Sequence, residues 1–223
     1  IMIAYIDIEH MSMKANKERW AARLARLLNV KYKLEELSGE PCLIIRYEKV
    51  SPEYLDSLGI KAICVSGSST ELTHYSKSDM AGMRQIFQTV TRPTIGFCGG
   101  HQMLSELYGV DVKPINEAES GTMTGGGWQN RTHEFGMTPV KVTQDHPLLA
   151  GLGKELVMFQ AHYWEVKSLP AGFSTFASSD ITPIQFMAHD SMPLFSVQFH
   201  PEEWDEEHTD GRTFLANFFD LIA

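Results

Sequence analysis

The chain has 223 residues, 43% of them hydrophobic, and its formal net charge at pH 7 is −9. This length can bury the core of one α/β domain and leaves no room for a second large one, so we expect a single catalytic unit over residues 1–223. The acidic balance disfavours binding to nucleic acid or to an anionic membrane surface, because phosphate groups would be repelled.

The N-terminal segment predicts a strand followed by a long helix. Residues 1–8 are mostly apolar and are typical of a first parallel strand. In the next segment the apolar residues recur at helical spacing and form one stripe: Trp20, Leu24, Leu27 and Leu28. The charged residues fall largely on the remaining face: Lys17, Glu18, Arg23 and Arg26.

Strands and helices continue to alternate after this helix. Residues 43–47 predict a second strand, Ser51 caps a helix that has an early proline, and residues 60–65 predict a third strand. The alternation favours a parallel sheet with crossover helices. The second half has shorter strands and more turns, and we expect its glycine run at 125–127 to form a surface hairpin or loop without chemistry.

The strongest single feature is Cys98, which follows the apolar run 93–95 and has glycine at both second-neighbour positions, Gly96 and Gly100. This spacing is typical of a nucleophile elbow, a tight strand-to-helix turn that pushes one side chain into solvent. The helix N-terminus lowers the pKa of such a thiol and stabilises the oxyanion formed when the thiolate attacks a carbonyl. The alternative is a buried structural cysteine beside a glycine turn.

A second candidate group lies at the end of an apolar, alternating segment, residues 194–199, which predicts a buried strand ending at His200. Open α/β sheets place catalytic groups at strand ends. In an extended chain Glu202 lies on the same side as His200, so it can fix the tautomer of the ring and stabilise the imidazolium. Taken alone, a histidine before a proline at a strand end is usually a surface histidine. Together with Cys98, the pattern predicts a nucleophile, a base and a residue that orients the base.

These motifs resemble those of class I glutamine amidotransferases, the Cys-His-Glu family that includes related γ-glutamyl hydrolases. Residues 96–102 are similar to the nucleophile motif of the family, and residues 197–202 match its His/Glu motif. The stretches 133–136 and 169–179 resemble further family segments, so the likeness runs from about residue 60 to the C-terminus. It implies an α/β fold with an open, mostly parallel central sheet flanked by helices, flavodoxin-like, with a smaller antiparallel extension.

The loop after the third predicted strand, residues 66–70, is expected to complete the oxyanion hole. In the family a Gly-rich loop here supplies a second backbone donor beside the N–H of Gly99, and Gly67 and Ser68 are the candidates. A nucleotide-binding loop is disfavoured, because no Gly-Lys-Ser/Thr ending follows. An ordinary strand-to-helix turn with a Ser/Thr cap remains open. The family usually has Gly-Gly-Pro where this chain has Gly-Ser-Ser.

The resemblance also implies residues that bind substrate. Gln102 and the backbone around His133, Glu134 and Phe135 are expected to hold the α-amino and α-carboxylate groups of glutamine. His162 lies where the family often carries His-Gly-Asp. It either lines the pocket, contacts a partner or packs as a core histidine.

The implied reaction is hydrolysis of the γ-amide of glutamine through a γ-glutamyl thioester on Cys98, which releases glutamate and ammonia. One interpretation is a glutaminase that supplies ammonia to a separate synthetase subunit, since the chain has no recognisable ATP site. A second is a stand-alone γ-glutamyl hydrolase acting on the γ-glutamyl amide of a metabolite, which the aromatic pair Tyr163 and Trp164 mildly favours. A third is a non-catalytic binding module.

The remaining composition predicts a cytoplasmic protein without metal or cofactor. Cys42, Cys64 and Cys98 cannot all pair, which is typical of a reducing compartment. Neither the cysteines nor the histidines outside the motifs show metal-ligand spacing. No apolar run reaches the length of a membrane span, and the N-terminus lacks the pattern of a signal sequence.

Overall fold

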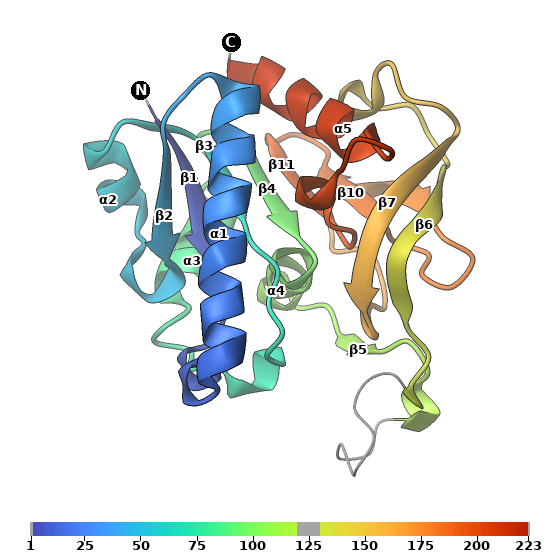
Figure 1. The fold of residues 1–223 in the computed structure, drawn as a ribbon, viewed down its shortest axis with the longest axis horizontal. Coiled ribbons are helices and arrows are strands. Elements are labelled where there is room, and N and C mark those ends of the chain that lie inside the picture. The colour runs from blue at the N-terminus through green and yellow to red at the C-terminus, as the bar shows by residue number, and fades with distance from the viewer. Residues whose placement is uncertain (1, 120–129, 223) are drawn as a thin grey trace.

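The computed structural model describes residues 2–119 and 130–222. Its main feature is one nine-stranded sheet in the order β2-β1-β3-β4-β11-β10-β9-β6-β7, with helices on both faces (Figure 1). A separate antiparallel pair joins β5 (Val112–Pro114) to β8 (Trp164–Val166). The glycine run 125–127 lies outside the described residues. Among the described helices, none has both the length and the hydropathy needed to cross a bilayer.

Five strands form the parallel part of the sheet, and four of them come from the first half of the chain. They are β1 (Met2–Asp7), β2 (Cys42–Arg46), β3 (Ile60–Val65), β4 (Thr94–Phe97) and β11 (Leu194–Val197). The connections run through α1 (Lys17–Ser38), α2 (Pro52–Ser57) and α3 (Ala81–Gln88), while α4 (Gly99–Leu107) follows β4. The expected parallel sheet with crossover helices is confirmed.

The buried side chains form two apolar clusters, one on each face of this sheet. Along β1, Ile3 and Tyr5 pack in the cluster that contains α1 and α5 (Asp210–Phe219). Ala4 and Ile6 pack in the cluster that contains α2, α3 and α4. This alternation is what two-sided burial of a central strand requires, because successive side chains point to opposite faces.

The C-terminal half extends the same sheet with antiparallel strands, as the fold class predicts. These are β10 (Phe186–His189), β9 (Phe173–Ser178), β6 (Glu134–Val142) and β7 (Glu155–His162). The β6–β7 pair is the longest, and its register places Glu134 directly opposite His162. The direction of pairing changes at β11, the strand that precedes His200.

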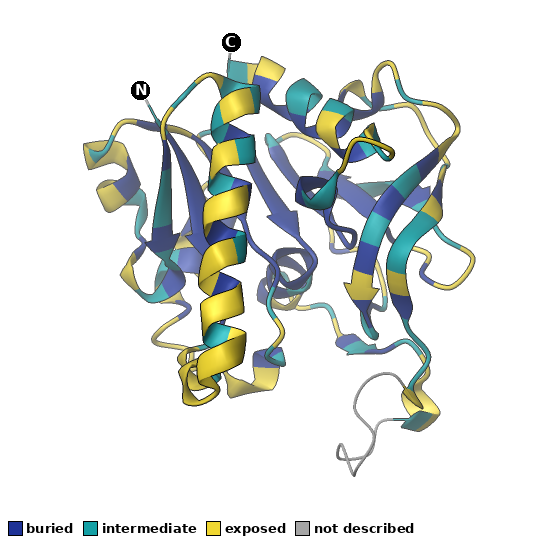
Figure 2. Ribbon diagram, viewed as in Figure 1, coloured by how far each residue is buried: buried dark blue, intermediate teal, exposed yellow. Residues whose placement is uncertain are grey.

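The expected apolar face of α1 is partly wrong. Leu27 is buried, but Leu24 and Leu28 expose 44% and 49% of their surface, and the outer side of α1 is largely exposed (Figure 2). The buried positions include Arg23, which the periodicity of the sequence predicts on the charged face. Arg23 is drawn inward because Asp7, at the end of β1, pairs with its guanidinium.

Candidate active site

The elbow at Cys98 has the predicted geometry. Cys98 joins β4 to α4 with φ 45° and ψ −100°, and it is the only described non-glycine residue with positive φ. The flanking glycines are required by close packing. A Cβ at Gly96 would lie 2.8 Å from the backbone of Gly100, and a Cβ at Gly100 would lie 2.9 Å from the carbonyl oxygen of Val65. A strained nucleophile held by close backbone contacts is typical of this turn.

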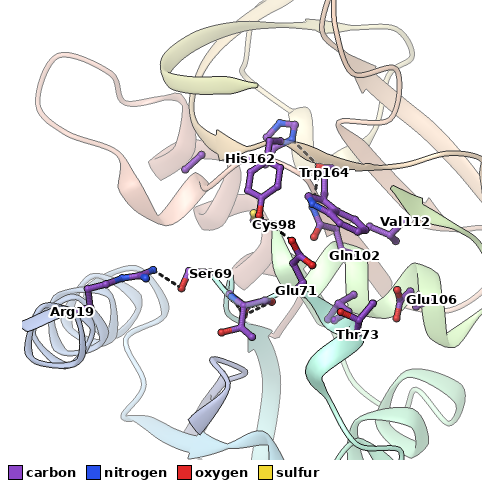
Figure 3. Close-up of a pocket in the computed structure, with 15 residues that line it drawn as sticks. Arg19, Ser69, Glu71, Thr73, Cys98, Gln102, Glu106, Val112, His162 and Trp164 are labelled. Carbon is purple, nitrogen blue, oxygen red and sulfur yellow. Dashed lines mark hydrogen bonds between the residues drawn. The ribbon is translucent and has the colours of Figure 1, made fainter. Parts of the chain in front are cut away.

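The thiol does not project into open solvent as expected. Cys98 exposes 5% of its surface and lies at the wall of a cavity of about 550 Å³. The Gln198 amide donates to its Sγ at 3.5 Å. In Figure 3, Gln102, His162 and Trp164 lie on one side of Cys98, and Arg19 and Ser69 lie on the α1 side. The cavity therefore gives a small molecule access to a thiol that bulk water barely reaches.

His200 lies beside this thiol and pairs with Glu202 as predicted, although the backbone between them is not extended. Pro201 begins a short 3₁₀ helix, Pro201–Glu203. Because proline fixes its own φ near the helical value, the chain turns directly after His200. The turn brings Glu202 Oε1 to 2.8 Å from His200 Nδ1, and both residues are buried.

The charges around His200 favour its protonated form. Burial lowers the pKa of His200, but the Glu202 carboxylate and a hydrogen bond with Cys98 outweigh this and raise the pKa to about 9. Burial likewise raises the pKa of Glu202, and the charges of His200 and Arg26 more than reverse the effect, so the pKa is lowered. The pair can therefore hold a proton on the ring beside the sulfur.

Two cations of α1 hold this turn from the side. Arg26 Nη2 lies 3.1 Å from His200 Nδ1 and 3.5 Å from Glu202 Oε1, and Arg26 Nε donates to Glu203 at 2.5 Å. Lys33 donates to the carbonyl oxygens of Glu202 and Trp204 at 3.1 and 2.7 Å. The segment that carries the histidine is thus fixed to α1 as well as to the sheet.

The loop after β3 lies against the turn at Cys98, where a second backbone donor for the oxyanion is expected. A Cβ at Gly67 would lie 2.7 Å from the His200 ring and 3.5 Å from Cys98 Cβ. A Cβ at Gly99 would lie 2.6 Å from the amide nitrogen of Ser68. In the described chain, neither the Ser68 N–H nor the Gly99 N–H donates to a protein acceptor. The two residues lie against each other beside the thiol, and Ser68 lines the cavity.

Of the residues expected to bind substrate, Gln102 and His162 line the cavity. The Gln102 amide donates to the carbonyl of Trp164 at 3.0 Å and to Gln198 at 3.2 Å. His162 has both ring nitrogens occupied: Nδ1 lies 2.9 Å from the Trp164 carbonyl, and Nε2 lies 2.9 Å from Glu134 Oε2. Of the alternatives for His162, a position in the cavity wall and a packed, hydrogen-bonded one are both realised.

The structure does not bring the other three candidates to the cavity. Glu134 turns its carboxylate inward to His162 and Gln185, because β6 and β7 pair in a register that makes Glu134 and His162 neighbours. The pKa of Glu134 is lowered, since His162 outweighs the opposing effect of burial. As the next residue of the strand, Phe135 places its side chain on the opposite face of the sheet, where it is 55% exposed. His133, just before the strand, is absent from the described cavity lining.

Several cavity residues carry no sequence signal of their own. The wall includes one guanidinium, Arg19, and two carboxylates, Glu71 and Glu106. The Tyr163 hydroxyl donates to Glu71 at 3.4 Å. These residues come from four separate segments of the chain, so only the fold reveals them as a group. The sequence hints at a changed cavity wall only at residues 162–164, where this chain has His-Tyr-Trp and the family often has His-Gly-Asp.

The other thiols differ from Cys98 in their surroundings. Cys42 and Cys64 are buried strand residues, and burial raises the pKa of Cys42 to about 12 and that of Cys64 well above its usual value. They are core thiols, as expected. In the described parts of the chain, no three His, Cys, Asp or Glu side chains group in a way that could hold a metal ion.

Comparison with known families gives one match over most of the chain. The sequence model of the family described as glutamine amidotransferase class-I matches residues 28–221. Among curated proteins, the A subunit of glutamine-hydrolyzing GMP synthase from Thermococcus kodakarensis is 31% identical over 131 residues, which is 59% of this chain and 61% of that protein. The glutamine-hydrolyzing GMP synthase from Phenylobacterium zucineum is 33% identical over 83% of this chain and 32% of its own length.

Solved structures agree on the fold. A Thermoplasma acidophilum protein assigned as the A subunit of a GMP synthase superposes with a TM-score of 0.72 at 23% identity, covering 99% of this chain and 94% of that one. A glutamine amidotransferase from Methylobacillus flagellatus superposes with a TM-score of 0.65 at 15% identity, over 99% and 94%. The sequence match spans about three fifths of the first curated relative.

Proposed function

The chain belongs to the class I glutamine amidotransferase family, and from this premise we propose that it hydrolyses the side-chain amide of glutamine and supplies ammonia to a separate synthetase. One observation carries the proposal: Cys98 sits strained at the N-terminus of α4, faces a cavity and contacts a His200–Glu202 pair. We treat residues 1–223 as one catalytic unit. Three free cysteines support a reducing compartment, so we place this unit in the cytoplasm.

In this mechanism the Cys98 thiolate attacks the side-chain carbonyl carbon of glutamine. The amides of Ser68 and Gly99 stabilise the oxyanion of the tetrahedral intermediate. His200 gives its proton to the leaving nitrogen, so that ammonia departs and a γ-glutamyl thioester remains. His200 then takes a proton from water, hydroxide attacks the thioester, and glutamate leaves as the thiol is restored.

The cavity also offers charges that match the two ends of the substrate. Arg19 is suited to the α-carboxylate, and Glu71 or Glu106 is suited to the α-ammonium group. The curated relatives are named for one subunit of a glutamine-hydrolyzing GMP synthase, which supports a synthetase as the receiver of ammonia. We propose that this chain has a synthetase of that kind for its partner.

A direct test replaces Cys98 by alanine. We expect Cys98→Ala to lower glutamine hydrolysis by at least roughly 10⁴-fold, because no thioester can form, and to leave the melting temperature close to that of the wild type. Cys42→Ala is the matched control, since Cys42 is a core thiol away from the cavity. Undiminished hydrolysis by Cys98→Ala would eliminate the mechanism.

A second measurement separates an enzyme from a binding module. A glutamine-like electrophile should add its mass to the Cys98 peptide of the wild type and to no other cysteine peptide. Absence of labelling would favour the non-catalytic interpretation.

A second candidate, a stand-alone γ-glutamyl hydrolase, is favoured by the size of the cavity. At about 550 Å³, with Tyr163 and Trp164 in its wall, it has more room than the compact glutamine molecule needs. Assaying glutamine beside a panel of γ-glutamyl amines decides between the two. Rapid turnover of a conjugate without turnover of glutamine would replace the first proposal by the second.

A further inference from the structure

One peptide unit of the loop after β3 has a support that the sequence did not reveal. Arg23 exposes only 8% of its surface, and its Nη2 lies 3.0 Å from the carbonyl oxygen of Gly67 and 2.8 Å from Ser66 Oγ, a hydroxyl that donates to the same carbonyl at 2.9 Å. Asp7 Oδ1 lies 2.5 Å from the same nitrogen. A buried guanidinium, anchored by a buried carboxylate, is thus aimed at the Gly67 carbonyl.

The orientation of this carbonyl determines where the next amide points. In a planar trans peptide the C=O of Gly67 and the N–H of Ser68 point in opposite directions. With its oxygen turned toward Arg23, the peptide directs the Ser68 N–H away from α1. That nitrogen lies against Gly99, where an added Cβ would come within 2.6 Å of it. The Ser68 and Gly99 amides therefore converge beside Cys98.

The reversed peptide would oppose the reaction. It would present a carbonyl oxygen, with its partial negative charge, to the place where the oxyanion forms, and only the Gly99 amide would remain as a donor. Glycine at position 67 adds no side-chain barrier to such a rotation. We propose that Arg23, anchored by Asp7, is a positioning residue that keeps the Ser68 N–H turned toward the oxyanion; this rests on the proposed function.

The rest of the loop is held independently of Arg23. The Ser68 hydroxyl lies 2.6 Å from the Tyr75 hydroxyl and 3.3 Å from Glu9, and the Ser69 N–H donates to Glu9 at 2.8 Å. Loss of the guanidinium leaves the Gly67 carbonyl with the Ser66 hydroxyl as its remaining donor, at 2.9 Å, and leaves the rest of the loop in place. Arg23 can therefore be replaced while the contacts of Ser68 and Ser69 remain.

The test compares two arginines that share Asp7. Arg46 donates to Asp7 Oδ2 at 2.7 Å but makes no contact with Gly67, so Arg46→Met is the matched control. We expect Arg23→Met to lower kcat for glutamine roughly 10- to 100-fold with little change in KM, because the lost interaction acts only in the transition state. Arg23→Lys should recover part of this loss, since one ammonium can reach the carbonyl. Arg46→Met should stay within about twofold of the wild type.

Two probes distinguish positioning from general damage. The γ-aldehyde analogue of glutamine adds to Cys98 as a tetrahedral thiohemiacetal, so its affinity should fall in parallel with kcat in the Arg23 variants. Iodoacetamide alkylates a thiolate by displacing iodide and forms no oxyanion, so its rate with Cys98 should be unchanged. If Arg23→Met does not fold, Arg23→Lys carries the same comparisons.

Several results would overturn the proposal. Folded Arg23 variants with wild-type kcat would do so, as would an equal loss in Arg46→Met or an aldehyde affinity that stays constant while kcat falls. A wild-type protein that hydrolyses no γ-glutamyl amide defeats the proposed function instead. Aldehyde binding to wild type and Arg23→Met then still decides whether Arg23 orients the peptide.

Discussion

Among the residues that the structure describes, two buried histidines pair with glutamates at nearly equal distances. His200 and Glu202 lie 2.8 Å apart, and His162 and Glu134 lie 2.9 Å apart. The first pair is formed within a single turn after β11, whereas the second joins opposite residues of β6 and β7. His162 lines the cavity, whereas His200 is not among the lining residues and lies beside Cys98, so proximity to the cavity does not identify the base.

The second ring nitrogen distinguishes the two pairs. His162 bonds Glu134 with one nitrogen and the Trp164 carbonyl with the other, so neither is left to exchange a proton with a substrate. His200 uses Nδ1 for Glu202, and its ring lies beside Cys98, the thiol that it would serve in the proposed mechanism. A carboxylate partner orients the histidine in both pairs, but a histidine can act as a base only where its second ring nitrogen is free to exchange a proton.

Truncating each histidine gives the largest contrast. We expect His200→Ala to lower kcat roughly 10⁴- to 10⁶-fold, because the proton acceptor and donor is lost. His162→Ala should lower kcat only about tenfold or less, and should cost about 1–3 kcal/mol of stability because Glu134 loses a buried partner. Steady-state kinetics and urea unfolding of both variants check this. Equal losses of kcat would break the distinction between the two pairs.

Replacing each glutamate by glutamine tests the electrostatic half of the comparison. Glu202→Gln should lower kcat roughly 10²- to 10⁴-fold. It should also lower the pKa of His200 from about 9, since burial keeps its lowering effect and the largest raising influence is gone. Glu134→Gln should leave the pKa of His200 unchanged. NMR titration of the His200 ring in the three proteins gives the answer, and equal shifts in both variants would contradict it.

The same pair gives the stability a pH dependence. Because the pKa of His200 is raised in the folded state, its stabilising contribution is complete below pH 6.5 and disappears as the pH rises to about 9. The lowered pKa of Glu202 contributes above pH 4.5 and is lost as the pH falls. Urea midpoints of the wild type should therefore decline between pH 6.5 and 9, and Glu202→Gln should flatten that decline.

The smallest expected effect concerns a cation. Arg26 contacts His200 and Glu202, whereas no lysine or arginine in the described chain forms a salt bridge with Glu134. Since 38% of the Arg26 side chain is exposed, Arg26→Met should raise the free energy of activation by about 1 kcal/mol or less. This corresponds to a decrease in kcat of up to about fivefold. Arg212→Met, which removes a surface pair with Glu36, is the control. A loss as large as that of Glu202→Gln would mean that Arg26 belongs to the catalytic pair itself.

Local sequence patterns were sufficient for most of the parallel half of the fold. The strand predicted at 60–65 is β3, and Ser51 caps α2 by accepting from the Tyr54 N–H. Both depend on neighbouring residues alone. The orientation of α1 was partly wrong because periodicity sorts residues by polarity, and it cannot detect that Arg23 finds a buried carboxylate 16 positions away.

The same distinction between local patterns and tertiary contacts applies to the residues of the candidate site. Cys98, His200 and Glu202 sit in short motifs whose glycines and proline shape the backbone, so their placement follows from local chemistry. The backbone around Glu134 was expected to hold substrate, but Glu134 is absent from the cavity lining, and its place depends on the register of β6 against β7, which no local pattern specifies. Arg19 and Glu71 meet at the cavity only through tertiary packing.

The positive φ of Cys98 has a consequence for how such a protein can change over generations. A non-glycine residue in that conformation costs on the order of 1–3 kcal/mol, which glycine would not incur. Selection for thermostability alone would therefore remove the sulfur from the elbow. A protein that keeps the thiol therefore keeps this cost to its free energy of unfolding. Mutations that raise its stability must occur elsewhere in the chain.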